Sequence, residues 1–282
     1  MKILRKIIEN KKIVFVLDII FIIIAVVFCS YIYKIELQKA VFITEVEQFS
    51  EENKNPVFKI GKIVLYKSAN AIDNSDGKLE DINISQFTDI AIYINNKSTI
   101  QNLTAENTIK EMYIDNIKLT FNLENGKYII NYKNPKEFGK YVALENYYDN
   151  KISFNILTSN QEVENADLDN NIYYTDCSNP ITLGFINKDF INNGKVLDTS
   201  GQLLFDGSIL KNANVNLETI SGIIEFSIHI KNNLGENFIC NVVINNDLTN
   251  NQENILNGYS IEINEPEGQI YDFLKYSVPL LP

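Results

Sequence analysis

One long apolar block dominates the pattern of hydrophobic and polar positions along the chain. Residues 13–33 are nearly all hydrophobic, and Asp18 is the only charged residue among them. About 20 such residues are enough for a helix to cross the roughly 30 Å hydrocarbon layer of a membrane. The pattern therefore predicts a transmembrane helix over residues 13–34.

The residues before this block indicate its orientation. Residues 1–12 contain five Lys or Arg side chains and one Glu, and basic flanks stay on the cytoplasmic side. The apolar run exceeds the roughly 7–15 residues of a cleavable signal peptide, and no small-x-small cleavage site follows it. We expect an uncleaved signal anchor with a cytoplasmic tail over residues 1–12 and an extracellular C-terminal region.

After the block, helical spacing continues in a more polar sequence. Apolar side chains recur at Ile35, Phe42, Val46 and Phe49, a spacing that places them on one face of a helix. We expect a helical stalk over residues 35–54 that ends near the breakers at 53–56.

From residue 55 the pattern changes to short alternating runs separated by turn residues, which is typical of antiparallel β proteins. We predict a mainly β fold in which the helix and stalk precede one or two antiparallel β-sandwich (Ig-like) domains. In the two-domain form, residues 55–158 and 171–282 are the domains, and the polar residues 159–170 link them.

Local turn chemistry predicts two hairpins and one short helix. Asn125-Gly126 would join strands 117–123 and 127–132, because both central residues of a type I′ turn need positive φ. Residues 232–235 would join strands 223–230 and 236–245. Asn134-Pro135, followed by Glu137, has the composition of a helix start and predicts a helix to about Tyr148.

Charge narrows the range of partners. The chain carries a net charge of −11, but residues 1–34 carry +4, so the remaining 248 residues carry −15. Such a surface repels nucleic-acid phosphates, and we expect no nucleic-acid binding. Frequent Ile, Asn and Lys are typical of an AT-rich bacterial genome, so we expect a bacterial cell-surface protein.

Three cysteines and one intramembrane acid are candidate special residues. Cys29 lies in the apolar block, so Cys177 and Cys240 are the pair available for a disulfide outside the membrane. Cys240 shares an alternating apolar face with its neighbours, and two free thiols would fit the sequence equally well. Asp18 is either a charge tolerated near the membrane interface or a contact to an intramembrane partner.

The remaining polar residues do not form a recognisable catalytic or metal motif. His229, the single histidine, alternates with apolar neighbours, which predicts an outward position on a strand rather than a catalytic one. Zinc needs about four Cys or His ligands, which is more than the sequence offers outside the membrane. Asp167, Asp169 and Asn171 do not fit a calcium loop and are expected to belong to a solvated linker. We predict no catalytic, cofactor-binding or metal residues.

The start of the apolar block resembles that of type IV pilin-like subunits. Val14-Phe15-Val16-Leu17-Asp18 is similar to the hydrophobic start of that family, which has Glu at its fifth position. Ile13 stands where the family has the Gly that precedes cleavage, and Asp18 replaces the Glu. The resemblance implies assembly by helix packing.

Together these patterns predict a single-pass membrane protein whose β region is a non-catalytic binding or structural module at the cell envelope. Its expected partners are the membrane, through residues 13–34, and an envelope protein or a cell-wall polymer. Two alternatives remain open. One is a subunit of an envelope or pilin-like assembly that packs through the transmembrane helix, and the other is a surface carbohydrate hydrolase.

Overall fold

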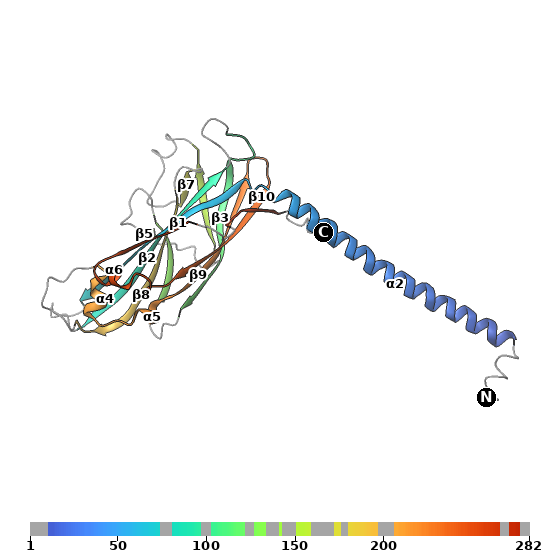
Figure 1. Ribbon diagram of the computed structural model, residues 1–282, viewed down its shortest axis with the longest axis horizontal. Coiled ribbons are helices and arrows are strands. Elements are labelled where there is room, and N and C mark those ends of the chain that lie inside the picture. The colour runs from blue at the N-terminus through green and yellow to red at the C-terminus, as the bar shows by residue number, and fades with distance from the viewer. Residues whose placement is uncertain are drawn as a thin grey trace, which may run out of the picture. The chain divides into compact units, whose positions relative to one another are not determined.

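The chain forms two compact units, Met1–Lys54 and Asn55–Pro282. The computed structural model describes residues 11–73, 81–96, 103–121, 127–133, 141–142, 151–158, 172–175, 180–196, 206–265 and 271–276. The first unit contains a helix and the second is mostly β structure (Figure 1).

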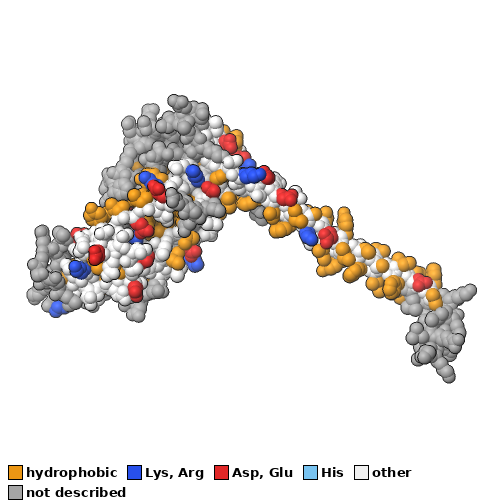
Figure 2. Space-filling view, viewed as in Figure 1, with side chains coloured by type: hydrophobic (Ala, Val, Ile, Leu, Met, Phe, Trp, Pro, Cys, Tyr) orange, Lys and Arg blue, Asp and Glu red, His pale blue; other side chains and the backbone are white. Residues whose placement is uncertain are grey.

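Helix α2 (Lys11–Glu52) runs without a break through both the predicted transmembrane segment and the predicted stalk. Its 42 residues correspond to about 63 Å at 1.5 Å per residue. Hydrophobic side chains are exposed along most of its length (Figure 2). Among the described residues, α2 is the one helix that is long and apolar enough to cross a membrane. This confirms the predicted N-terminal apolar helix.

The β unit contains two open, six-stranded sheets. Sheet A has the strand order β11 (Ser260–Asn264), β1 (Phe58–Asp73), β2 (Ile82–Asn96), β8 (Ile181–Gly194), β4 (Lys127–Lys133) and β5 (Tyr141–Val142). Sheet B has the order β12 (Leu274–Tyr276), β10 (Asn237–Asn246), β9 (Gly222–Asn232), β3 (Ile109–Phe121), β6 (Ile152–Leu157) and β7 (Tyr173–Thr175). The β6–β7 pair is parallel.

One hydrophobic core is shared by both sheets. Alternation along each strand directs every second side chain inward, and the inward residues of β1, β2, β4 and β8 meet those of β3, β6, β9 and β10 in one cluster. A smaller cluster lies where α4 (Ser208–Asn212), α5 (Leu217–Ile220) and α6 (Gln252–Leu256) gather at one end of the β unit (Figure 1). The predicted mainly β fold is therefore confirmed.

The boundary predicted at residues 159–170 does not divide the β unit. Sheet A combines β1, β2 and β4 with β8 and β11, and sheet B combines β3 and β6 with β9 and β10. Strands from both sides of the proposed linker thus pair within each sheet and share one core. Residues 159–170 themselves lie outside the described part of the chain.

Two of the three local turn and helix predictions need correction. β3 and β4, which flank Asn125-Gly126, belong to different sheets, so they do not form the predicted hairpin. Tyr141–Val142, expected within a helix, pairs with β4 as strand β5. The β9–β10 hairpin is confirmed, with Lys231 opposite Asn237.

The C-terminal segment closes the core beside the first strand. The Ile60 N–H donates to the Tyr271 carbonyl and the Phe273 N–H donates to the Phe58 carbonyl, each at 3.0 Å. The Phe58 ring lies edge-on to Phe273, with centroids 6.3 Å apart, and to Phe238 at 5.3 Å. The start of β1 is therefore joined to residues 271–273, which directly precede β12.

Truncating a central core residue should cost far more stability than truncating the same residue type on the surface. Ile228 on β9 is fully buried, whereas Ile261 on β11 is 55% exposed. We expect Ile228→Ala to lower the free energy of unfolding by about 3 kcal/mol and Ile261→Ala to change it by less than about 0.5 kcal/mol. Urea unfolding of residues 55–282 measures both, and equal losses would contradict the assigned core.

Candidate functional site

Two polar clusters stand out in the β unit, and the first is built around the buried side chain of Lys67. A register shift between Ile60 and Lys62 changes which residues of β1 face inward. After the shift, Ile63, Leu65 and Lys67 share the inner face, and Lys67 is only 1% exposed. A buried ammonium group needs compensating partners.

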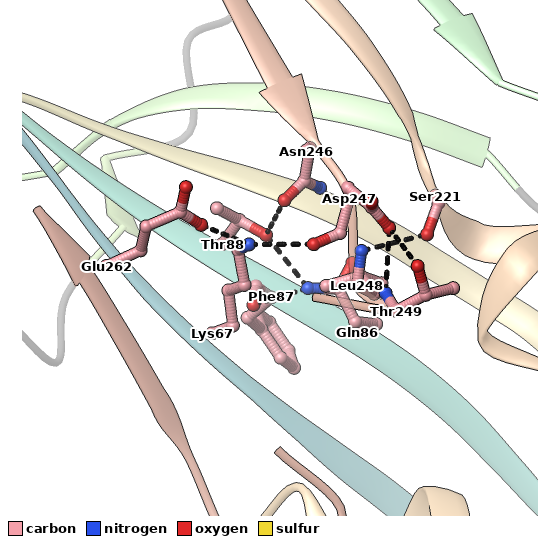
Figure 3. Close-up of polar contacts among 10 residues, drawn as sticks. All are labelled: Lys67, Gln86, Phe87, Thr88, Ser221, Asn246, Asp247, Leu248, Thr249 and Glu262. Atoms are coloured by element: carbon pink, nitrogen blue, oxygen red, sulfur yellow. Dashed lines mark hydrogen bonds and ion pairs between the residues drawn. The ribbon is translucent and has the colours of Figure 1, made fainter. Parts of the chain in front are cut away.

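Two oxygen atoms from other segments supply those partners (Figure 3). Lys67 Nζ lies 2.8 Å from Glu262 Oε2 on β11 and donates to the Asp247 carbonyl at 3.0 Å. The Glu262 side chain is 33% exposed, so the ion pair reaches from the interior to the edge of sheet A. The contact joins β1, the edge strand and the turn after β10.

Lys67 belongs to a buried polar layer between the two hydrophobic clusters. On β1 it follows Leu65 of the larger cluster and precedes Ala69 of the smaller one. Along β2, β8 and β10, buried polar residues likewise lie between members of the larger and the smaller cluster. These polar residues are Gln86, Thr88, Asn187 and Asn246. The layer therefore crosses the β unit from strand to strand.

Hydrogen bonds connect the members of this layer. Thr88 Oγ1 donates to Asn246 Oδ1 at 3.2 Å and receives a bond from Gln86 Nε2 at 2.9 Å. Asn187 Nδ2 donates to Gln86 Oε1 at 2.7 Å and also to the Ile220 carbonyl at 3.1 Å. Such a network holds neighbouring strands in one register, because a buried polar atom that lost its partner would be destabilising.

The turn that accepts from Lys67 is itself held in place. Asp247 Oδ1 accepts bonds from the Thr249 hydroxyl at 2.6 Å and the Thr249 N–H at 2.8 Å. The Thr249 hydroxyl, assisted by backbone N–H groups, keeps the pKa of Asp247 below its ordinary value. The Leu248 N–H donates to Ser221 Oγ at 2.9 Å. These contacts position the Asp247 carbonyl and give the cluster a structural role.

The second cluster surrounds His229 on the outer face of sheet B. His229 Nε2 lies 2.8 Å from Asp115 Oδ1, and Nδ1 lies 3.2 Å from the Tyr276 hydroxyl. Its ring stacks on Tyr113, with centroids 4.4 Å apart and planes 8° from parallel. The histidine faces outward as predicted, but these neighbours leave it only 9% exposed.

A bulge in β3 lies next to Asp115. The pairing of β3 with β9 shifts between Asp115 and Lys118, and Asn116 adopts a left-handed φ of 52°. Asn116 Nδ2 then donates to Asp115 Oδ1 at 3.0 Å. Bulges re-aim side chains, and here the bulge brings an amide to the carboxylate oxygen that also contacts His229.

The arrangement satisfies both nitrogens of the imidazole. A neutral His229 can donate from Nε2 to Asp115 while Nδ1 accepts from the Tyr276 hydroxyl. Burial and the adjacent Tyr276 raise the pKa of Tyr113 to about 12. A general-base role would require His229 to release one of its two partners.

Apart from His229, the residues singled out in the sequence are not found in either cluster. Asp18 is exposed on α2. Cys240 is buried in the core, and burial raises its pKa to about 12. Cys177, Asp167, Asp169 and Asn171 lie outside the described residues, so the Cys177–Cys240 disulfide remains a prediction. Within the described part, no group of three His, Cys, Asp or Glu side chains could hold a metal ion.

Lys67 and the partners of His229 are not among the residues that the sequence pattern indicated. A lysine at an inward position of an alternating strand is a usable signal, since such a charge requires a buried partner. Asp115 and Tyr276 give no comparable signal, because they reach His229 only through the pairing of β3, β9, β10 and β12.

The chain matches no family model, no curated protein and no solved structure.

Removing either partner of the Lys67–Glu262 pair should have unequal effects. Glu262→Gln leaves a buried ammonium group without its carboxylate, so we expect a loss of about 3 kcal/mol in unfolding free energy. Lys67→Met removes the charge and leaves a carboxylate that water can reach, so about half that loss is expected. Urea unfolding of the double variant should resemble Lys67→Met, whereas additive losses would contradict the coupling.

Loss of the Tyr276 hydroxyl should destabilise the β unit through His229. We expect Tyr276→Phe to cost about 1 kcal/mol, because His229 Nδ1 loses its partner. Tyr259→Phe is the matched control, since Tyr259 is 56% exposed and its change should stay below about 0.5 kcal/mol. Thermal unfolding compares them, and indistinguishable melting temperatures would argue against the His229–Tyr276 contact.

Proposed function

We propose that the chain is a single-pass membrane protein with a cytoplasmic N-terminus and an extracellular β unit. The β unit acts as a non-catalytic binding or structural module at the bacterial cell envelope. The observation that carries this proposal is the continuous, exposed apolar helix that leads directly into the β unit.

The charge distribution supports the proposed orientation. Basic side chains are concentrated in the first 12 residues, before the apolar block, and favour the cytoplasmic side. The net charge of −15 after residue 34 keeps an exported β unit soluble. For the β unit itself we propose an antiparallel β-sandwich of the immunoglobulin-like kind, since two mostly antiparallel sheets share one core.

The competing functions receive less support. A carbohydrate hydrolase would require two carboxylates flanking the scissile bond, whereas in the His229 cluster one carboxylate, Asp115, contacts an imidazole whose two nitrogens are both bonded. An envelope or pilin-like assembly would use α2, where Asp18 is exposed and could meet an intramembrane partner. We therefore prefer the non-catalytic module and retain helix-mediated assembly as the second candidate.

The proposed orientation predicts which residues a membrane-impermeant maleimide can reach in intact cells. In a Cys29→Ser, Cys177→Ser background, the buried Cys240 stays unlabelled. A cysteine replacing the exposed Glu253 of α6 should be labelled in intact cells, and one replacing Lys6 only after permeabilisation. The protein should also remain in the membrane after alkaline carbonate extraction.

The reverse labelling pattern would overturn the orientation, and release by carbonate would overturn the membrane tether. The non-catalytic role is tested separately by incubating purified residues 55–282 with cell-wall glycan. We expect no new reducing ends. A release of reducing ends that disappears in Asp115→Asn would support the hydrolase instead.

A further inference from the structure

An apolar stripe that runs from the end of the apolar block along the stalk follows a seven-residue repeat. The stripe consists of seven positions whose spacing alternates between four and three residues: Phe28, Ile32, Ile35, Lys39, Phe42, Val46 and Phe49. We call these positions the seam. Six of the seven are apolar, and all lie within the unbroken helix α2.

The seam is uncovered in the single chain. Phe42 is 63% exposed, Val46 49% and Phe49 42%, although all three lie beyond the apolar block. In an isolated straight helix such a stripe drifts by about 20° per heptad, and two helices that supercoil keep it between them. A strict spacing of this kind is what a coiled coil requires.

We propose that the stalk pairs with the stalk of a second copy of this chain in a parallel, in-register coiled coil. The inference rests on the proposed membrane tether, because the tether determines how two copies meet. Copies inserted in one membrane have the same direction and depth, so each seam residue faces its own counterpart. A seam with the same heptad positions on both helices is self-complementary in this orientation.

One set of seam residues has the type found in two-stranded coiled coils. Ile32 and Val46 occupy the first set of heptad positions and are β-branched, as in parallel dimers that carry Leu at the second set. Phe28, Phe42 and Phe49 occupy the other set, together with Ile35. These large side chains are the knobs that enter holes on the facing helix.

Lys39 is the one polar residue on the seam and fixes the register. A single lysine at such a position specifies alignment, because any shift would place it against an apolar layer. Glu36 lies three residues earlier on the flank of the seam and is exposed. Its carboxylate offers the Lys39 ammonium group of either copy an oppositely charged partner.

Disulfide trapping of the full-length chain in native membranes tests this pairing. In a Cys29→Ser, Cys177→Ser background, cysteines are placed on the seam at Phe42 or Phe49, or on the opposite helix face at Thr44 or Glu51. After mild oxidation we expect at least about fivefold more homodimer from the seam positions. Two differently tagged copies identify the adduct as homotypic.

A second comparison separates the seam from general hydrophobicity. With Phe42→Cys as reporter, Ile35→Ser and Val46→Ser together should reduce the adduct by about fivefold. Leu37→Ser and Val41→Ser remove exposed apolar side chains outside the seam and should leave the adduct unchanged.

Equal trapping on both faces, or adducts only with another protein, would overturn the pairing. Carbonate extraction of the same membranes separates this failure from failure of the tether. A protein that stays in the membrane without seam-specific adducts contradicts only the coiled coil, whereas a released protein contradicts the proposed function as well.

Discussion

Strands of both sheets bury one face against a shared core, and the arrangement of the other parts depends on this requirement. On β9, Ile224, Phe226, Ile228 and Ile230 are all almost fully buried. The opposite face of the same strand carries His229 and its polar neighbours. Where the core is interrupted, as at Lys67, the buried polar groups need partners from adjacent strands.

Hydrophobic periodicity was sufficient to predict the long helix and most strands, because it depends only on local sequence. It could not determine which strands pair. Asn125-Gly126 suits a tight turn, yet β3 pairs with β9 in one sheet and β4 pairs with β8 in the other. Both partner strands lie far away in the sequence, so local sequence does not indicate these pairings. The same non-local pairing joins strands across residues 159–170, where composition alone indicated a linker.

The two polar clusters differ in how much of them the sequence reveals. Lys67 occupies an inward position of a strand, so its burial and its need for a partner could be inferred, although Glu262 is 195 positions away. The surroundings of His229 could not be inferred. Its outward direction follows from alternation, but its enclosure by Tyr113 and Tyr276 depends on strand pairing and on the bulge at Asn116.

The contact between the first strand and the C-terminal segment affects when the core can close during synthesis. Phe58 and Phe273 are 215 positions apart in the sequence, and synthesis at roughly 5–20 residues per second separates them by roughly 10–40 s. During that interval the start of β1 has neither its terminal hydrogen-bond partners nor the aromatic ring that covers it. The rate of chain delivery, rather than the intrinsic folding rate, therefore sets the earliest moment at which the core can close.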